Sequence, residues 1–207
     1  MNVGPLLFLG ILLSTALSFW GLVIGPTFQI GRQEITNTYP AIRIGAARRG
    51  AEVYRSLGCV ECHTQQVRPR GYGTDIERGW GIRRTVAQDY LYDRPALIGN
   101  LRIGPDLANI GARQPDAKWH LEHLYDPREV VPGSMMPPYR FLFEVREGKA
   151  IPTDDAEALV AYLLSLQSQA PVFEAPLPQP ATNAVPEGAD TNAPAATNAA
   201  STNAPAK

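Results

Sequence analysis

The start of the chain carries an apolar run that limits what the protein can fold into. Residues 6–24 read LLFLGILLSTALSFWGLVI and hold no charge over nineteen positions. As a helix rising about 1.5 Å per residue, this run spans roughly 28 Å, close to the ~30 Å hydrocarbon core of a bilayer. Pro5 suits the first turn of a helix, and Gly25-Pro26 predicts its end. The sequence therefore predicts a single transmembrane helix within an anchor over residues 1–28.

A cleaved signal peptide is the alternative interpretation of this run. Signal peptides carry Lys or Arg before a shorter apolar core and small residues at a cleavage site. No Lys or Arg precedes Leu6, and no A-x-A site follows the run, so an uncleaved anchor is favoured. Arg32 beyond the helix would by itself weakly place the following domain in the cytoplasm.

The rest of the sequence is rich in loops and nearly neutral. The 207 residues include 19 prolines and 18 glycines, so much of the chain cannot be regular helix or strand. Nineteen Lys and Arg against twenty Asp and Glu argue against a nucleic-acid partner, and two cysteines exclude a disulfide-dense scaffold. Between residues 33 and 84, the chain has nine arginines and only five acidic residues. This imbalance fits a docking face, a site that balances buried anions, or a solvated loop.

Residues 59–63 read CVECH, which is the C-x-x-C-H signature of covalent haem attachment. Its spacing lets the thiols of Cys59 and Cys62 reach the two vinyl groups of one porphyrin and points His63 at the iron. A thioredoxin-like C-x-x-C would need a strand–turn–helix setting, and a zinc site would need two further ligands. We therefore predict one covalently bound haem c. Because haem c is attached outside the cytoplasmic membrane, we expect a bacterial inner-membrane protein with its cytochrome domain in the periplasm.

A second axial ligand is expected downstream, and it is usually a methionine where electron transfer is the task. Met135 and Met136 in VVPGSMMPPYRF are the candidates, because Met1 is remote. A thioether opposite an imidazole favours ferrous iron and raises the potential. The turn Gly104-Pro105-Asp106-Leu107 can aim a backbone carbonyl at the second nitrogen of His63, although Gly-Pro also marks ordinary turns. Arg68 is a candidate to neutralise a haem propionate.

Three further helices are expected in this domain. The segment 40–57 has apolar residues at helical spacing, the segment 115–125 starts at a proline, and Thr153 caps a helix over 154–169. His120 and His123 could bind a metal, contact a propionate or lie on a solvated face, and the solvated face is favoured.

The predicted architecture is therefore mostly α. We expect the anchor (1–28), a linker (29–40), a cytochrome c-like helical domain (41–169) and a disordered tail (170–207) rich in Ala, Pro, Thr and Asn, which cannot bury enough apolar area to offset its ordering entropy.

Several segments together resemble a known family. MNVGPLLFLGILLS, GCVECHTQQVRP, RIGPDLANIG and KWHLEHLYDPREVVPGSMMPPY are similar to the mono-haem subunit II of cbb3-type cytochrome c oxidases, over roughly residues 1–168. The resemblance implies an anchored, all-helical cytochrome c domain and selects Met136, which precedes the proline, as the ligand.

The resemblance also implies a non-catalytic relay. Electrons would pass from a soluble cytochrome c or a di-haem cytochrome c subunit, through this chain, to the catalytic haem-copper subunit that reduces oxygen. The alternatives are the small cytochrome c subunit of a nitric oxide reductase, a free membrane-anchored cytochrome c, and a haem sensor with an open sixth site.

Overall fold

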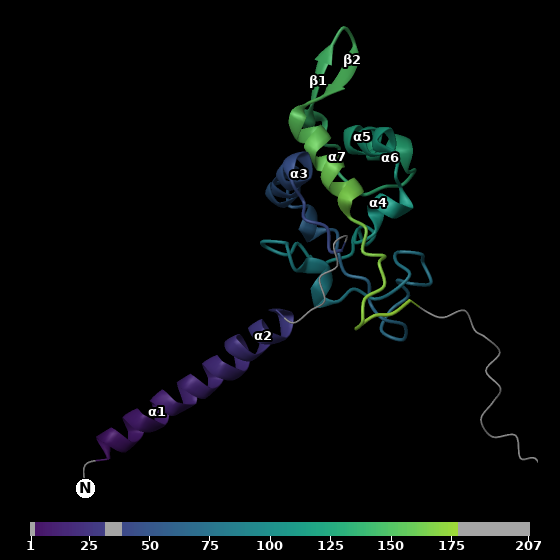
Figure 1. Ribbon diagram of the computed structural model, residues 1–207. Coiled ribbons are helices and arrows are strands. Elements are labelled where there is room, and N and C mark those ends of the chain that lie inside the picture. Colours follow the sequence, from purple (N-terminus) through teal and green to yellow (C-terminus); the bar gives the residue numbers. More distant parts are fainter. Residues whose placement is uncertain (1–2, 32–38, 178–207) are drawn as a thin grey trace, which may run out of the picture.

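The computed structural model describes residues 3–31 and 39–177. It is mostly helical, as predicted, with an apolar N-terminal helix, a helical domain and one small two-stranded sheet (Figure 1). The predicted linker lies largely, and the predicted disordered tail mostly, outside the described residues.

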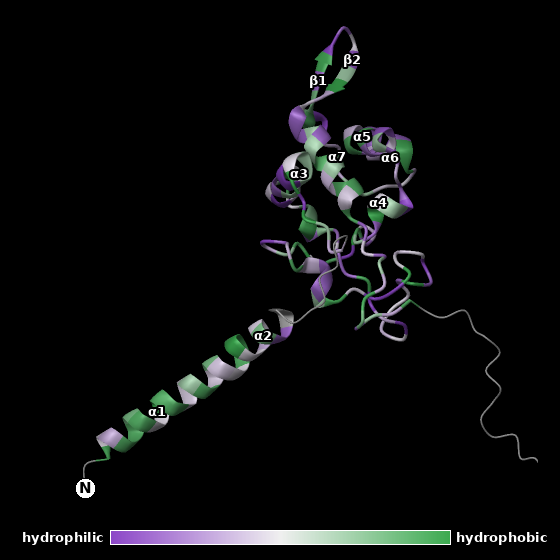
Figure 2. Ribbon diagram, viewed as in Figure 1, coloured by the Kyte–Doolittle hydropathy of each residue, from purple (hydrophilic) through white to green (hydrophobic). Residues whose placement is uncertain are grey.

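The N-terminal helix is long and apolar enough to cross a membrane, as Figure 2 shows by its colour. It comprises α1 (Gly4–Phe19), a π-helical turn (Trp20–Ile24) and α2 (Gly25–Gly31). The prediction that Gly25-Pro26 ends it was wrong. Proline has no N–H and crowds the preceding turn, and the wider π turn accommodates this while the Gly25 N–H donates to the Trp20 carbonyl. The Thr27 hydroxyl also donates to the Val23 carbonyl, at 2.7 Å.

The core of the domain forms where α3 (Gly45–Ser56) crosses α7 (Asp154–Ser165). The rings of Tyr54 and Tyr162 lie 5.3 Å apart there, and each residue is 1% exposed. A Cβ on Gly50 would lie 1.9 Å from the Ala158 carbonyl oxygen, so the close crossing requires a glycine. The segment before α3 is not helical, contrary to the prediction of a helix from residue 40, and Ile44 is 76% exposed instead of facing the core.

Shorter elements complete the domain between α3 and α7. In chain order they are 3-10 turns at Cys59–Glu61 and Ala87–Tyr90, α4 (Ile110–Arg113), α5 (Ala117–Tyr125), α6 (Pro127–Val130), a 3-10 turn at Arg140–Leu142, and the antiparallel strands β1 (Phe143–Arg146) and β2 (Lys149–Pro152). The α7 helix starts after the Thr153 cap, as predicted, but ends at Ser165 and not at residue 169.

The hairpin was not predicted. It projects from the top of the domain in Figure 1, and residues Glu147 and Gly148 at its tip both have positive φ angles, 51° and 76°. Two such residues are what a tight two-residue hairpin loop requires.

The packed chain continues past residue 169, where we expected the tail to begin. Val172 and Ala175 are buried against Val86. The Arg83 Nε donates to the Ala170 carbonyl at 2.6 Å, and the Arg83 guanidinium forms a buried ion pair with Asp89 at 2.7 Å. Residues 170–177 therefore belong to the packed domain, because Arg83 donates a hydrogen bond to their backbone.

Candidate cofactor-binding site

The two cysteines and His63 lie in one tight turn directly after α3. Gly58 ends the helix with a φ of 71°, a backbone conformation that suits glycine. The backbone N–H groups of Cys62 and His63 then both donate to the Cys59 carbonyl, at 3.2 Å and 3.0 Å. Both cysteines are free thiols of intermediate exposure. The turn therefore gathers two thiols and an imidazole within five residues, as the sequence spacing predicted.

The imidazole of His63 is held by the predicted Gly-Pro turn. Its Nδ1 lies 2.8 Å from the Pro105 carbonyl oxygen. Since a carbonyl only accepts, Nδ1 carries the proton, and Nε2 is left with its lone pair to act as a metal ligand. The turn is fixed by two backbone bonds, from the Gly104 N–H to the Cys62 carbonyl at 2.9 Å and from the Leu107 N–H to the Thr64 carbonyl at 2.7 Å. The role predicted for this turn is confirmed.

The Cys59 thiol is not activated for dithiol redox chemistry. Burial raises its pKa to about 11, so it stays protonated at neutral pH, whereas reactive cysteines have lowered pKa values. The Tyr139 side chain packs against the same core as this thiol, and burial also raises the pKa of Tyr139 to about 12. An unactivated thiol favours a role as an attachment point over the thioredoxin-like alternative.

The two adjacent methionines have different surroundings. Met135 is 75% exposed. Met136 is partly buried and packs against the same apolar core as Cys59, Val60 and Tyr139. The structure thus brings Met136, and not Met135, to the core that the cysteine turn borders.

A half-buried cation, Arg113, lies near His63. Arg113, at the end of α4, donates from Nη2 to the Asp106 carbonyl, while its Nε is buried without a hydrogen-bond partner among the described residues. Burial lowers the pKa of both Arg113 and His63, and the Arg113 charge lowers that of His63 further. A half-buried guanidinium whose buried Nε has no partner among the described residues suits an anionic group such as a haem propionate, so the residues present fit this cofactor.

Arg68, which we considered for the propionate, has another partner. Its guanidinium pairs with the fully buried Asp75, with Nη2 and Oδ1 3.0 Å apart.

The expectation that His120 and His123 line a solvated face was wrong. His120 is 2% exposed, and its Nε2 lies 2.8 Å from the Gln114 carbonyl oxygen. The His123 ring stacks on Trp119 with centroids 4.8 Å apart, and its Nδ1 is buried without a partner in the described part of the chain. Burial lowers the pKa of both histidines. In residues 3–31 and 39–177, no group of three or more His, Cys, Asp and Glu side chains could hold a metal ion, as a zinc site would require.

Comparison with known proteins identifies the family. The family model described as "Cytochrome C oxidase, mono-heme subunit/FixO" matches residues 5–163. The chain belongs to this family. Membership in the mono-haem subunit family makes the chain a subunit of a cytochrome c oxidase with a role in electron transport, and the apolar N-terminal helix fits a membrane-anchored subunit. A search of curated proteins finds no match.

Sequence reasoning missed three residues of the site. Tyr139 packs against the same core as Cys59, Arg113 has a buried Nε without a partner among the described residues, and Asp106 is fully buried within the turn that holds His63. Of the three, only Asp106 had a local signal, because it lies in the Gly-Pro turn that the sequence analysis singled out.

Proposed function

We propose that Cys59 and Cys62 attach one haem c through thioether bonds, that His63 and Met136 are its axial ligands, and that the chain relays electrons within the oxidase. The observation that carries this proposal is the 2.8 Å contact between His63 Nδ1 and the Pro105 carbonyl oxygen, directly beside the two thiols. It fixes the tautomer in which Nε2 is free to ligate iron.

When bound, the haem supplies a one-electron couple between ferrous and ferric iron, with a potential raised by methionine ligation. The chain's residues orient and shield that group. Pro105 holds the proton of the His63 ring at Nδ1, which keeps the imidazole a neutral and basic ligand. Met136, which packs against the core, would offer a soft sulfur ligand, and the half-buried Arg113 would supply a positive charge for a propionate.

The family match and the apolar N-terminal helix support a direction of electron transfer. We infer that electrons arrive from a soluble cytochrome c or a di-haem cytochrome c subunit and leave toward the catalytic haem-copper subunit, which reduces oxygen. The apolar helix would hold the chain in the bacterial inner membrane by a single pass. The domain would lie in the periplasm, because haem c is attached on that side. The oxidase family match favours this role over a nitric oxide reductase subunit.

The test is a reduced-minus-oxidised spectrum with a pyridine haemochrome assay on the detergent-extracted protein and its native partners. A c-type signal accompanied by b-type haem and copper supports the proposal. A b-type signal with non-haem iron points instead to a nitric oxide reductase, and a lone c-type signal points to a free carrier. No haem at all would overturn the assignment of Cys59, Cys62, His63 and Met136.

A further inference from the structure

The side chain of Asp106 joins the two chain segments that hold His63 and Pro105. Asp106 is 0% exposed. Its Oδ2 accepts from the Thr64 hydroxyl and the Gln66 N–H, both at 2.7 Å, and its Oδ1 accepts from the Ala108 N–H at 2.9 Å. Thr64 directly follows His63, and Asp106 directly follows Pro105. The carboxylate therefore connects the two segments one residue beyond the contact between the imidazole and the carbonyl.

Both oxygens of the Asp106 carboxylate take part in this connection. Three donors from two segments occupy both oxygens, and an amide in its place offers only one acceptor atom. A backbone hydrogen bond from the Leu107 N–H to the Thr64 carbonyl joins the same two segments. Loss of the carboxylate would leave a buried N–H unpaired and allow the turn to shift away from the His63 ring.

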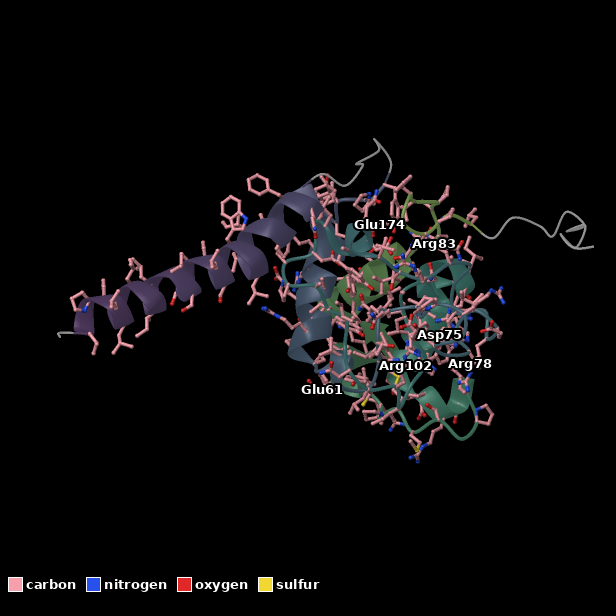
Figure 3. All side chains as sticks on the ribbon, turned by 90° about the horizontal axis from the view of Figure 1, so that it is seen from below. Glu61, Asp75, Arg78, Arg83, Arg102 and Glu174 are labelled. Carbon is pink, nitrogen blue, oxygen red and sulfur yellow. The ribbon has the colours of Figure 1, made fainter. Side chains whose placement is uncertain are left out.

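The Asp106 carboxylate has cations near it but no cationic donor at normal hydrogen-bond distance. Arg102 Nη2 lies 3.7 Å from Asp106 Oδ2, and Arg113 donates to the backbone carbonyl of Asp106. The other terminal nitrogen of Arg102 lies only 2.7 Å from Asp75 Oδ1, and Figure 3 shows Arg102 and Asp75 beside each other. Arg102 is thus bound closely by Asp75 and also donates from Nε to the Thr64 hydroxyl at 2.8 Å, and the donors at normal hydrogen-bond distance from the Asp106 carboxylate are neutral. A buried carboxylate held in this way places negative charge beside His63.

We propose that Asp106 is a positioning residue for the axial ligand His63: it clamps the Pro105 carbonyl to the imidazole and places a fixed negative charge next to the iron site. This inference rests on the proposed function, because it needs a haem on His63. A negative charge stabilises ferric over ferrous iron, so Asp106 keeps the reduction potential lower than the ligands alone would set it.

The experiment compares the full-length holoprotein with its Asp106→Asn and Asp75→Asn variants. Asp75 is the matched control, since it is also 0% exposed and also bound to Arg102, while its carboxylate accepts hydrogen bonds from Arg68 and Arg102 and not, in the described part of the chain, from Thr64, Ala108 or the turn. At the wild-type midpoint potential, Asp106→Asn should raise the ratio of reduced to oxidised haem about tenfold, a shift of ~59 mV for one electron. It should also change the g values of the ferric low-spin EPR signal, which report the orientation of the axial ligands. Asp75→Asn should leave both readouts near wild type.

A second variant separates the clamp from the charge. Thr64→Val removes one hydrogen bond to Asp106 and keeps the carboxylate. It should alter the EPR signal while shifting the potential less than Asp106→Asn does. Equal effects of Asp106→Asn and Asp75→Asn on both readouts would overturn the inference. If Asp106→Asn loses its haem, an unchanged EPR signal in Thr64→Val overturns the clamp and an altered one supports it. A wild-type protein without c-type absorption would instead refute the proposed function.

Discussion

Gly104 lies against the face of the His63 imidazole so closely that a Cβ on Gly104 would be 2.2 Å from the ring atom Cε1. The same ring bonds to the carbonyl of the next residue, Pro105. The ring and the turn can therefore approach each other only because residue 104 has no side chain.

Gly104→Ala should therefore displace the His63 ring or the turn. We expect a loss of stability of about 1–3 kcal/mol, as for other overpacked sites, and a weakened low-spin c-type spectrum. Thermal unfolding followed by absorption of the holoprotein measures both. Gly10→Ala is the control, because no atom lies within 4 Å of the added Cβ there. If Gly104→Ala had the unfolding temperature and the spectrum of the wild type, the turn would have moved to accommodate the added methyl group at little cost in stability.

The two adjacent methionines provide the next prediction. Met136→Leu should abolish the sulfur-to-iron charge-transfer band of the ferric protein and lower the midpoint potential, because the thioether ligand is lost. Met135→Leu is the matched control and should do neither, since Met135 is 75% exposed. Absorption spectra and redox titration of both variants distinguish which methionine is the ligand. The reverse result would assign the ligand to Met135.

The features that the sequence predicted well can be recognised from short motifs. The Thr153 cap follows from a few neighbouring residues. The 2.8 Å contact of His63 with Pro105 joins residues 42 positions apart, but a short motif marks each end of it, and the contact is the one expected for the Gly-Pro turn.

The features that the sequence did not predict depend on tertiary packing or on a backbone irregularity that no residue pattern marks. His120 was expected to be solvated, but the Gln114 carbonyl and the packing of α5 bury it. Residues 170–177 are held by Arg83, which no local pattern connects to them. Pro26 does not end the first helix, because a π turn before it absorbs the misfit.

The buried pair of Arg83 and Asp89 should be important for stability. Arg83→Met leaves Asp89 as an uncompensated buried charge, for which we expect a loss of about 3–5 kcal/mol, and it also frees the Ala170 carbonyl. Denaturant unfolding measures the loss. Arg70→Met is the control, because its ion pair with Glu77 is exposed and should contribute little. Similar losses in the two variants would contradict the assigned role of Arg83.

The buried histidines predict how stability depends on pH. Burial lowers the folded-state pKa of His120, so the unfolded chain takes up a proton near pH 6.5 while the folded chain stays neutral. The free energy of unfolding should therefore be flat above about pH 7 and decrease as the pH falls below 6.5, by at most about 1.4 kcal/mol per pH unit for this group. His123 acts in the same direction.

His120→Gln tests this link, because glutamine does not titrate and can still donate to the Gln114 carbonyl. Denaturant unfolding of the holoprotein between pH 7.5 and 5 should show a smaller decrease in the variant than in the wild type. Carboxylates with lowered pKa values, such as Asp75, lose their contribution only below about pH 4 and do not affect this window. Parallel curves for the two proteins would mean that His120 takes up its proton equally in the folded and unfolded states.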